Sequence, residues 1–329
     1  MIETELLRID SPDGRPIPLG LLEKRNRSID RRLPPALLLH GATLGAMLYD
    51  LPRAGYSLMT ELAAKGRAVY VLDVRGYGHS PGGAVMEETP SRNPPFAGVE
   101  EAVRDVAAAV DFILERQSVA ALDLLGFSWG TITAARYAGA HPEKIARLAL
   151  YAPLYAERNA AWLRRIADPE DRTRLAPAFG AYRLITLEDV VGRWNAELPT
   201  SDADRYREDG IPELVFEAFA SLDPLSASRA PRAFRCPNGA LADLVSVFNG
   251  RPLYDPAGLT MPTLLVRGAD DNTSTETDSL HLLAKIASPI KHYRVIAHGS
   301  HFLCIERNRA QLYDQLNVFL GPVADTRRI

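Results

Sequence analysis

Short apolar runs alternate with stretches of helical periodicity along most of this chain. Mainly apolar runs at 36–39, 68–73 and 120–125 each lead into a glycine-containing segment. Between them, residues 55–65 and 99–116 place apolar side chains at the spacing of an amphipathic helix. Buried strands alternating with such helices are typical of a mostly parallel sheet covered on both faces. The pattern therefore predicts an α/β fold with a doubly wound sheet.

Further strands and helices are predicted near both ends of the chain. At the amino end, Glu5–Ile9 and Pro18–Glu23 flank the turn signal Ser11-Pro12-Asp13-Gly14, which predicts an opening hairpin. After residue 130, the pattern predicts a helix at Thr131–Ala138 and a strand at Arg147–Tyr151. The remaining expected elements are a strand at Thr263–Arg267, a helix at Glu276–Ala287, a strand at His292–Ile296 and a helix at Asn308–Leu320.

The alternation stops between about Ala152 and Pro256, over roughly 100 residues, which is far longer than an ordinary connection. Helical patterns occur there near Tyr155–Ala167, Leu187–Glu197 and Glu213–Ala220. We therefore expect a core in two parts, residues 1–152 and 257–329, with a mainly helical insertion at 153–256.

Composition narrows the class of protein. The 329 residues are 47% hydrophobic, enough for a large core, and the formal net charge is −3 with acidic and basic residues mixed throughout. This balance argues against a nucleic-acid partner and against a polybasic membrane anchor. The amino end has no signal-peptide pattern and no apolar run approaches membrane-spanning length, so a soluble, cytoplasmic protein is expected.

Metal-binding and disulfide patterns are not found in the sequence. The 2 cysteines are too few for a disulfide framework or a cysteine-based metal site. The 7 histidines include no HExxH or comparable ligand spacing. We therefore expect no metal and no cofactor.

The segment Gly126-Phe127-Ser128-Trp129-Gly130 follows an expected strand and precedes an expected helix. A G-x-S-x-G in this position is a nucleophile elbow, a turn so sharp that the serine adopts strained backbone angles. Gly126 and Gly130 remove the collisions that side chains would cause on either side of the turn. The turn presents Ser128 Oγ beside a helix N-terminus, where developing negative charge is favoured.

A serine hydroxyl becomes a good nucleophile only when a base removes its proton and a third group holds that base. In a doubly wound sheet, such partners belong in loops at the carboxyl ends of strands. Two later loops supply them, 268–272 with Asp270 and Asp271, and 297–302 with His298 and His301. The order of the candidates along the chain is therefore serine, aspartate, histidine.

With these residues the sequence resembles the α/β-hydrolase-fold serine hydrolases, a family of esterases and lipases whose triad runs in that order. The resemblance covers nearly the whole chain apart from the insertion. The segments that carry it are His40-Gly41, Asp73-x-Arg75-Gly76-x-Gly78-x-Ser80, Gly126-Phe127-Ser128-Trp129-Gly130, Gly268-x-x-Asp271 and Gly299-x-His301.

The resemblance implies a triad of Ser128, Asp271 and His301. Members of the family place the acid three residues after the glycine that ends the strand, which selects Asp271 and leaves Asp270 as a turn or capping residue. They place the base at Gly-x-His, which selects His301 and leaves His298 as a loop residue.

The resemblance also implies an oxyanion hole. Its backbone N–H donors are those of Trp129, which follows the nucleophile, and Ala42, with Thr43 as the alternative to Ala42. His40 is expected to orient this loop.

In the family, the insertion commonly forms a cap over the active site. Here it carries nine aromatic residues, most of them expected to pack the core of the cap and some to face the cleft: Trp162, Phe179, Tyr182, Trp194, Tyr206, Phe216, Phe219, Phe234 and Phe248. Because a pocket closed in this way is mainly apolar, the expected partner is a small ester-like substrate with an apolar or aromatic moiety.

The resulting hypothesis is a serine hydrolase that cleaves a carboxylic ester or lactone through an acyl-enzyme and that can form a homo-oligomer. The same triad also serves hydrolysis of amides, thioesters or carbon–carbon bonds and acyl transfer, and the fold alone does not choose among them. A non-catalytic small-molecule receptor on the same scaffold is the alternative from another class.

Overall fold

A central eight-stranded sheet runs through the computed structural model, which describes residues 1–13 and 16–322. The order of its strands is β1-β2-β4-β3-β5-β6-β9-β10. The strands are β1 (Ile2–Asp10), β2 (Pro18–Asn26), β3 (Ala36–Leu39), β4 (Val69–Leu72), β5 (Leu122–Phe127), β6 (Ile145–Tyr151), β9 (Thr263–Gly268) and β10 (Lys291–Ile296).

Most of this sheet is parallel. Strands β1 and β2 form the expected antiparallel hairpin, and β2 is antiparallel to β4, whereas every other neighbouring pair is parallel. Gly14 of the predicted turn lies outside the described residues. Strand β3 lies between β4 and β5, so that Leu39 is in register with Leu72 on one side and with Gly126 on the other. The chain order reverses at this point, and open α/β sheets bind ligands at the carboxyl edge of such a reversal.

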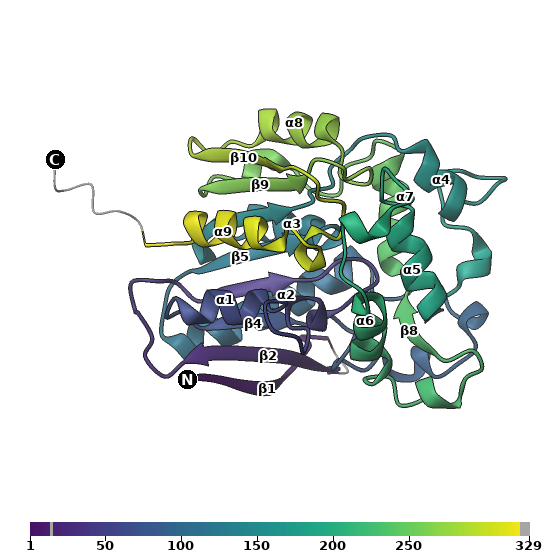
Figure 1. Cartoon of the computed structure of the whole chain (residues 1–329), viewed down its shortest axis with the longest axis horizontal. Helices are drawn as coiled ribbons and strands as arrows, with labels where there is room; N and C mark the ends of the chain where they lie inside the picture. Colours follow the sequence, from purple (N-terminus) through teal and green to yellow (C-terminus); the bar gives the residue numbers. More distant parts are fainter. Residues whose placement is uncertain (14–15, 323–329) are drawn as a thin grey trace.

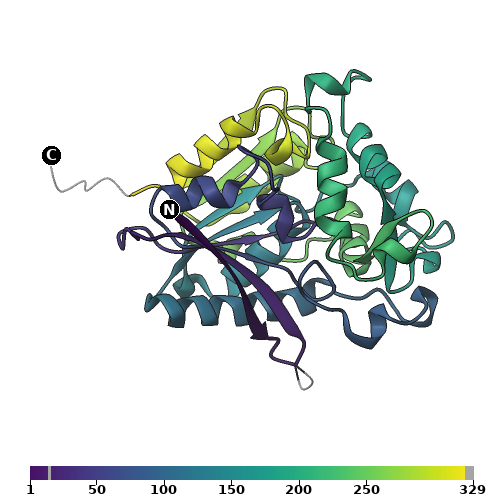
Figure 2. The same cartoon turned by 60° about the horizontal axis from the view of Figure 1, so that its bottom comes forward.

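Helices cover both faces of the sheet. Helices α1 (Leu58–Ala64) and α9 (Arg309–Phe319) pack on one face, and α2 (Val99–Gln117) and α3 (Trp129–Ala140) on the other (Figures 1 and 2). Helix α8 (Glu276–Lys285) connects β9 to β10. All residues of β3 and β5 are buried, because helices cover them on both sides. The predicted α/β fold with its doubly wound sheet is confirmed.

A second group of elements lies between β6 and β9 in the sequence, and we call residues 152–262 the inserted segment. This segment lies beyond one end of the sheet (Figure 1). Its elements are α4 (Ala160–Ile166), β7 (Tyr182–Thr186), α5 (Leu187–Asn195), α6 (Ile211–Ala220), β8 (Ala233–Pro237) and α7 (Gly239–Phe248).

Three of these elements were not expected from the sequence. Strands β7 and β8 form a two-stranded antiparallel ribbon, and α7 follows β8 after one residue. Each strand is short, and α5 and α6 lie between the two strands in the sequence. No local pattern of residues therefore indicates that they pair. Residues 235–240 comprise the end of β8 and the start of α7.

Candidate active site

The elbow at Ser128 has the strained geometry that its glycines imply. Strand β5 ends at Phe127, helix α3 begins at Trp129, and Ser128 between them has φ 55° and ψ −121°. A Cβ at Gly126 would lie 2.2 Å from the carbonyl oxygen of Gly130. A Cβ at Gly130 would lie 2.4 Å from the carbonyl oxygen of His40. Neither position tolerates a side chain, because each collision is with backbone.

Ser128, His301 and Asp271 form a continuous hydrogen-bonded row. The distance from Ser128 Oγ to His301 Nε2 is 2.9 Å, and that from His301 Nδ1 to Asp271 Oδ2 is also 2.9 Å. The other oxygen of Asp271, Oδ1, accepts the backbone N–H groups of Thr273 at 2.9 Å and Ser274 at 2.8 Å. A carboxylate at Nδ1 favours the tautomer with its proton there, so that Nε2 faces the hydroxyl as an acceptor.

The neighbouring aspartate and histidine lie elsewhere. Asp270 Oδ2 accepts the hydroxyl of Tyr206 at 2.8 Å, so this carboxylate contacts the inserted segment instead of the imidazole. His298 is exposed, with φ 54°, and its carbonyl accepts the side-chain amide of Asn308 at 3.2 Å. Of the sequence candidates, the structure therefore brings Asp271 and His301 to Ser128.

The loop after β3, residues 40–45, lies against the serine, and we call it the β3 loop. A Cβ at Gly41 would lie 3.3 Å from Ser128 Cβ. His40 is fully buried beneath this loop, where burial lowers its pKa, and its Nε2 accepts the N–H of Val74 at 3.2 Å. Its Nδ1 therefore carries the proton and donates to the carbonyl of Gly41 at 2.8 Å. His40 thus orients the loop, as expected.

The two backbone N–H groups named from the sequence have no acceptor among the described residues. Within the described part of the chain, neither the N–H of Ala42 nor that of Trp129 makes a hydrogen bond. Both residues flank Ser128, one from the β3 loop and one from the first turn of α3. Free backbone donors at a helix N-terminus are favourable partners for an anion.

Ser128 and His301 open into a cavity of about 710 Å³, which also borders Ala42 and Thr43 of the β3 loop. Its apolar wall comes mainly from the inserted segment: Trp162, Ile166, Phe179, Leu184, Ile185, Val190, Trp194, Val215, Leu241 and Leu244. Charged side chains also border it: Arg165, Arg183, Glu188, Asp189 and Arg193. Most of the wall is apolar, as a pocket for a small ligand requires.

The aromatic residues of the inserted segment divide between this cavity and internal packing. Trp162 and Phe179 line the cavity, and Trp194 borders it while being buried. Phe234 packs against both Phe216 and Phe219, at ring-centroid distances of 6.1 and 5.8 Å. The expected division between packing and lining is therefore present.

Two indoles join the inserted segment to the loops that carry Asp271 and His301. Trp162 Nε1 donates to Thr273 Oγ1 at 2.8 Å, and Thr273 also donates its backbone N–H to Asp271. Trp194 Nε1 donates to Glu306 Oε1 at 2.8 Å, and Glu306 Oε2 accepts the N–H of Ser300, next to His301. Sequence reasoning missed these links, because each joins residues more than 100 positions apart.

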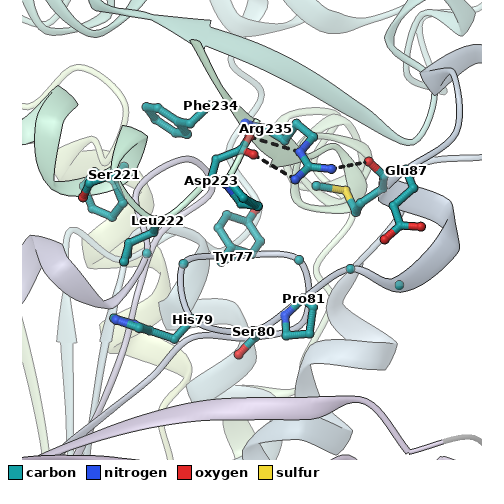
Figure 3. A pocket seen from close by; sticks show the side chains of 18 of the residues that line it. Tyr77, His79, Ser80, Pro81, Glu87, Ser221, Leu222, Asp223, Phe234 and Arg235 are labelled. Atoms are coloured by element: carbon teal, nitrogen blue, oxygen red, sulfur yellow. Dashed lines mark hydrogen bonds and ion pairs between the residues drawn. The ribbon is translucent and has the colours of Figure 1, made fainter. Parts of the chain in front are cut away.

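A second cavity, of about 490 Å³, lies beside the segment that follows β4 (Figure 3). Tyr77, His79, Asp223 and Arg235 are among the side chains that line it, and Arg235 Nη2 pairs with Asp223 Oδ1 at 2.8 Å (Figure 3). It shares Thr43 with the first cavity but includes none of Ser128, Asp271 and His301. The candidate chemistry therefore belongs to the first cavity.

Within residues 1–13 and 16–322, no helix combines the length and the apolar character needed to span a bilayer. In the same residues, no three or more His, Cys, Asp or Glu side chains gather in a way that could hold a metal ion. Cys236 and Cys304 are both buried and free, and burial raises the pKa of each thiol.

Comparison with solved structures finds the same fold over nearly the whole chain. A bromoperoxidase from Bacillus anthracis is 18% identical, with a TM-score of 0.65, over 96% of this chain and 99% of that one. A thermophilic esterase from Thermogutta terrifontis is 20% identical, with a TM-score of 0.62, over 96% of this chain and 98% of that one. A 2-hydroxy-6-oxo-6-phenylhexa-2,4-dienoate hydrolase from Rhodococcus sp. strain RHA1 is 19% identical, with a TM-score of 0.58, over 97% and 100%.

At these identities the structural similarity concerns the fold alone. No curated protein sequence is significantly similar to this chain. A family model of the alpha/beta hydrolase fold, however, matches residues 34–308, which include β3, the elbow, Asp271 and His301. The sheet order, the elbow at the end of β5 and this match lead to one conclusion: the chain belongs to the α/β-hydrolase-fold family.

Proposed function

We propose that this protein is a serine hydrolase that cleaves a carboxylic ester or lactone carrying an apolar or aromatic moiety. The observation that carries the proposal is the buried row Ser128–His301–Asp271, with 2.9 Å at each step, set on a strained turn and facing a cavity. A serine, a base and an orienting acid at these distances are the parts that acyl transfer requires.

In the first half of the reaction, Ser128 Oγ attacks the substrate carbonyl carbon while His301 Nε2 takes the hydroxyl proton. Asp271 holds the imidazole and stabilises its charged form. The N–H groups of Trp129 and Ala42 bind the oxyanion of the tetrahedral intermediate. When the intermediate collapses, His301 gives its proton to the leaving alcohol, and the acyl group stays on Ser128.

In the second half, His301 removes a proton from water, and the resulting hydroxide attacks the acyl-enzyme carbonyl. The oxyanion forms again at the same two N–H groups, and its collapse breaks the bond to Ser128 Oγ. His301 returns its proton to that oxygen, and the carboxylic acid leaves. No step in this sequence uses a cofactor.

The inserted segment would act as a cap that selects the substrate. Its apolar side chains form most of the cavity wall, which supports an apolar or aromatic group on the acyl or alcohol side. A second candidate is hydrolysis of a carbon–carbon bond by the same residues. The similarity in fold to the dienoate hydrolase named above is the observation that raises that candidate.

The first test is hydrolysis of p-nitrophenyl esters of increasing acyl length by the wild type, Ser128→Ala and His301→Ala. We expect turnover by the wild type that is lost in both variants, together with labelling of Ser128 by a fluorophosphonate probe. Labelling without turnover of any ester would support a competent triad and direct attention to carbon–carbon substrates. A wild type that neither labels nor hydrolyses, yet binds small molecules, would instead be a receptor.

A further inference from the structure

One backbone carbonyl of the β3 loop, that of Ala42, accepts hydrogen bonds from three side chains. Tyr77 Oη donates at 3.0 Å, Arg183 Nη2 at 3.1 Å and Cys236 Sγ at 3.4 Å. Arg183 comes from β7 and Cys236 from β8, so two of the three donors belong to the inserted segment. Arg183 Nη2 also donates to Thr43 Oγ1 at 2.8 Å.

These bonds fix the direction of the N–H groups in the loop. In a planar trans peptide, the N–H points opposite to the C=O. His40 holds the carbonyl of Gly41 and so directs the N–H of Ala42, whereas the three donors above hold the carbonyl of Ala42 and so direct the N–H of Thr43. Neither N–H makes a hydrogen bond within the described part of the chain.

Arg183 is the charged member of the three donors. Burial raises the pKa of Tyr77 and that of Cys236, so both donate as neutral groups. Among the described residues, Arg183 has no carboxylate within ion-pair distance, and its Nη1 donates to the neutral oxygens of Pro237 at 3.0 Å and Asn238 at 2.8 Å. Arg183 therefore bonds to the peptide between Ala42 and Thr43 without a direct ion-pair partner of its own among those residues.

A cation on the carbonyl side of a peptide polarises it, which makes the N–H on the opposite side a stronger donor. The same charge adds a favourable potential where an oxyanion would form. Both effects come from a residue of the inserted segment. The first acts through the peptide and the second through space, since Arg183 contacts the loop and not the serine.

We propose that Arg183 is a positioning residue that makes the oxyanion hole depend on the inserted segment. In this proposal the N–H of Thr43 is a further donor beside those of Trp129 and Ala42. Arg183 holds and polarises the peptide that carries it, and without Arg183 that peptide loses its charged anchor. This inference rests on the proposed function, because it concerns the same reaction at Ser128.

The test compares Arg183→Gln and Arg183→Lys with Arg235→Gln. Arg235 is the control. It joins β8 to the carbonyl of Met86 at 2.7 Å, as Arg183 joins β7 to the β3 loop, but it lies at the second cavity (Figure 3). We expect Arg183→Gln to lower kcat by about 10- to 100-fold with little change in KM, less than the 10²–10³ for loss of a whole donor. Arg183→Lys should recover part of this loss, and Arg235→Gln should keep kcat within about threefold of the wild type.

A second readout separates the oxyanion hole from general folding. A boronic acid forms a tetrahedral adduct with Ser128 and so resembles the oxyanion intermediate. Its affinity should fall from the wild type to Arg183→Gln by the same factor as kcat/KM, whereas the affinity of the product alcohol should not change. If no ester is turned over, the rate of fluorophosphonate labelling replaces kcat. Full kcat in Arg183→Gln, or an equal loss in Arg235→Gln, would overturn the inference while the proposed function stands. A wild type that neither labels nor hydrolyses would overturn both.

Discussion

The indole Nε1–H of Trp129 donates a hydrogen bond to Asp243 Oδ2 at 2.8 Å, joining the first turn of α3 to helix α7 of the inserted segment. The same oxygen accepts the N–H of Val99 at 2.8 Å. Burial raises the pKa of Asp243 to about 7, although both hydrogen bonds and Arg136 oppose the rise. The residue that follows Ser128 is therefore bonded to a carboxyl group that titrates near neutral pH.

This pKa makes stability depend on pH. Between the ordinary value of 3.8 and about 7, folded Asp243 holds a proton that the unfolded chain has released. The stabilising contribution of this group is thus complete below pH 3.8 and is lost as the pH rises through about 7. Asp243→Asn cannot ionise and avoids the loss.

We therefore expect the free energy of unfolding of Asp243→Asn, relative to the wild type, to rise by a few kcal/mol from about pH 4 to about pH 8, at about 1.4 kcal/mol per pKa unit. Urea unfolding at a series of pH values measures this difference. A difference that stays constant with pH would contradict the shifted pKa.

Substitutions of the two adjacent aspartates should have very different effects on kcat. Asp271→Asn keeps the shape of the site but disfavours the tautomer that leaves His301 Nε2 free, so kcat should fall by about 10⁴-fold. Asp270→Asn removes only the charge beside Tyr206, and kcat should stay within a few-fold of the wild type. Steady-state kinetics on the best ester of the panel measures both, and the reverse ranking would move the acid to Asp270.

The elbow glycines should not accept alanine. At Gly126, the new Cβ would overlap the backbone of Gly130, so Gly126→Ala should lower the free energy of unfolding by at least about 2 kcal/mol and abolish turnover. The matched control is Gly192→Ala in helix α5, where a Cβ meets open space and should add about 0.5–1 kcal/mol of stability. Thermal unfolding of the two variants should therefore shift in opposite directions.

A buried ion cluster at the other end of β5 should affect stability without affecting chemistry. Asp123 pairs with Arg67 at 2.7 Å and with Arg147 at 2.6 Å, and all three are buried. Asp123→Ala leaves two buried cations without their partner and should cost about 3–5 kcal/mol. Removing the exposed partner of Lys144 by Asp111→Ala should cost less than about 1 kcal/mol. Both variants should retain wild-type kcat while folded, since neither residue borders the cavity.

Local features of the sequence were enough to predict the fold and the elbow. Buried apolar runs, helical periodicity and the glycines on either side of Ser128 each act over a few residues, and the structure has the sheet, the helices and the turn where these signals lie. From the residues alone, however, Asp270 and Asp271 were equal candidates, and so were His298 and His301.

Tertiary structure decided which of these candidates meet. In the loops that follow β9 and β10, Asp271 contacts the imidazole of His301, whereas Asp270 accepts a hydrogen bond from Tyr206. Both contacts join residues that lie far apart in the sequence. Arg183 and Cys236 reach the carbonyl of Ala42 from 141 and 194 positions away. No local pattern encodes such contacts, because they exist only when the inserted segment packs on the core. The sequence by itself therefore determined the elements of the central sheet and its helices and the turn that exposes Ser128, whereas packing determined what surrounds it.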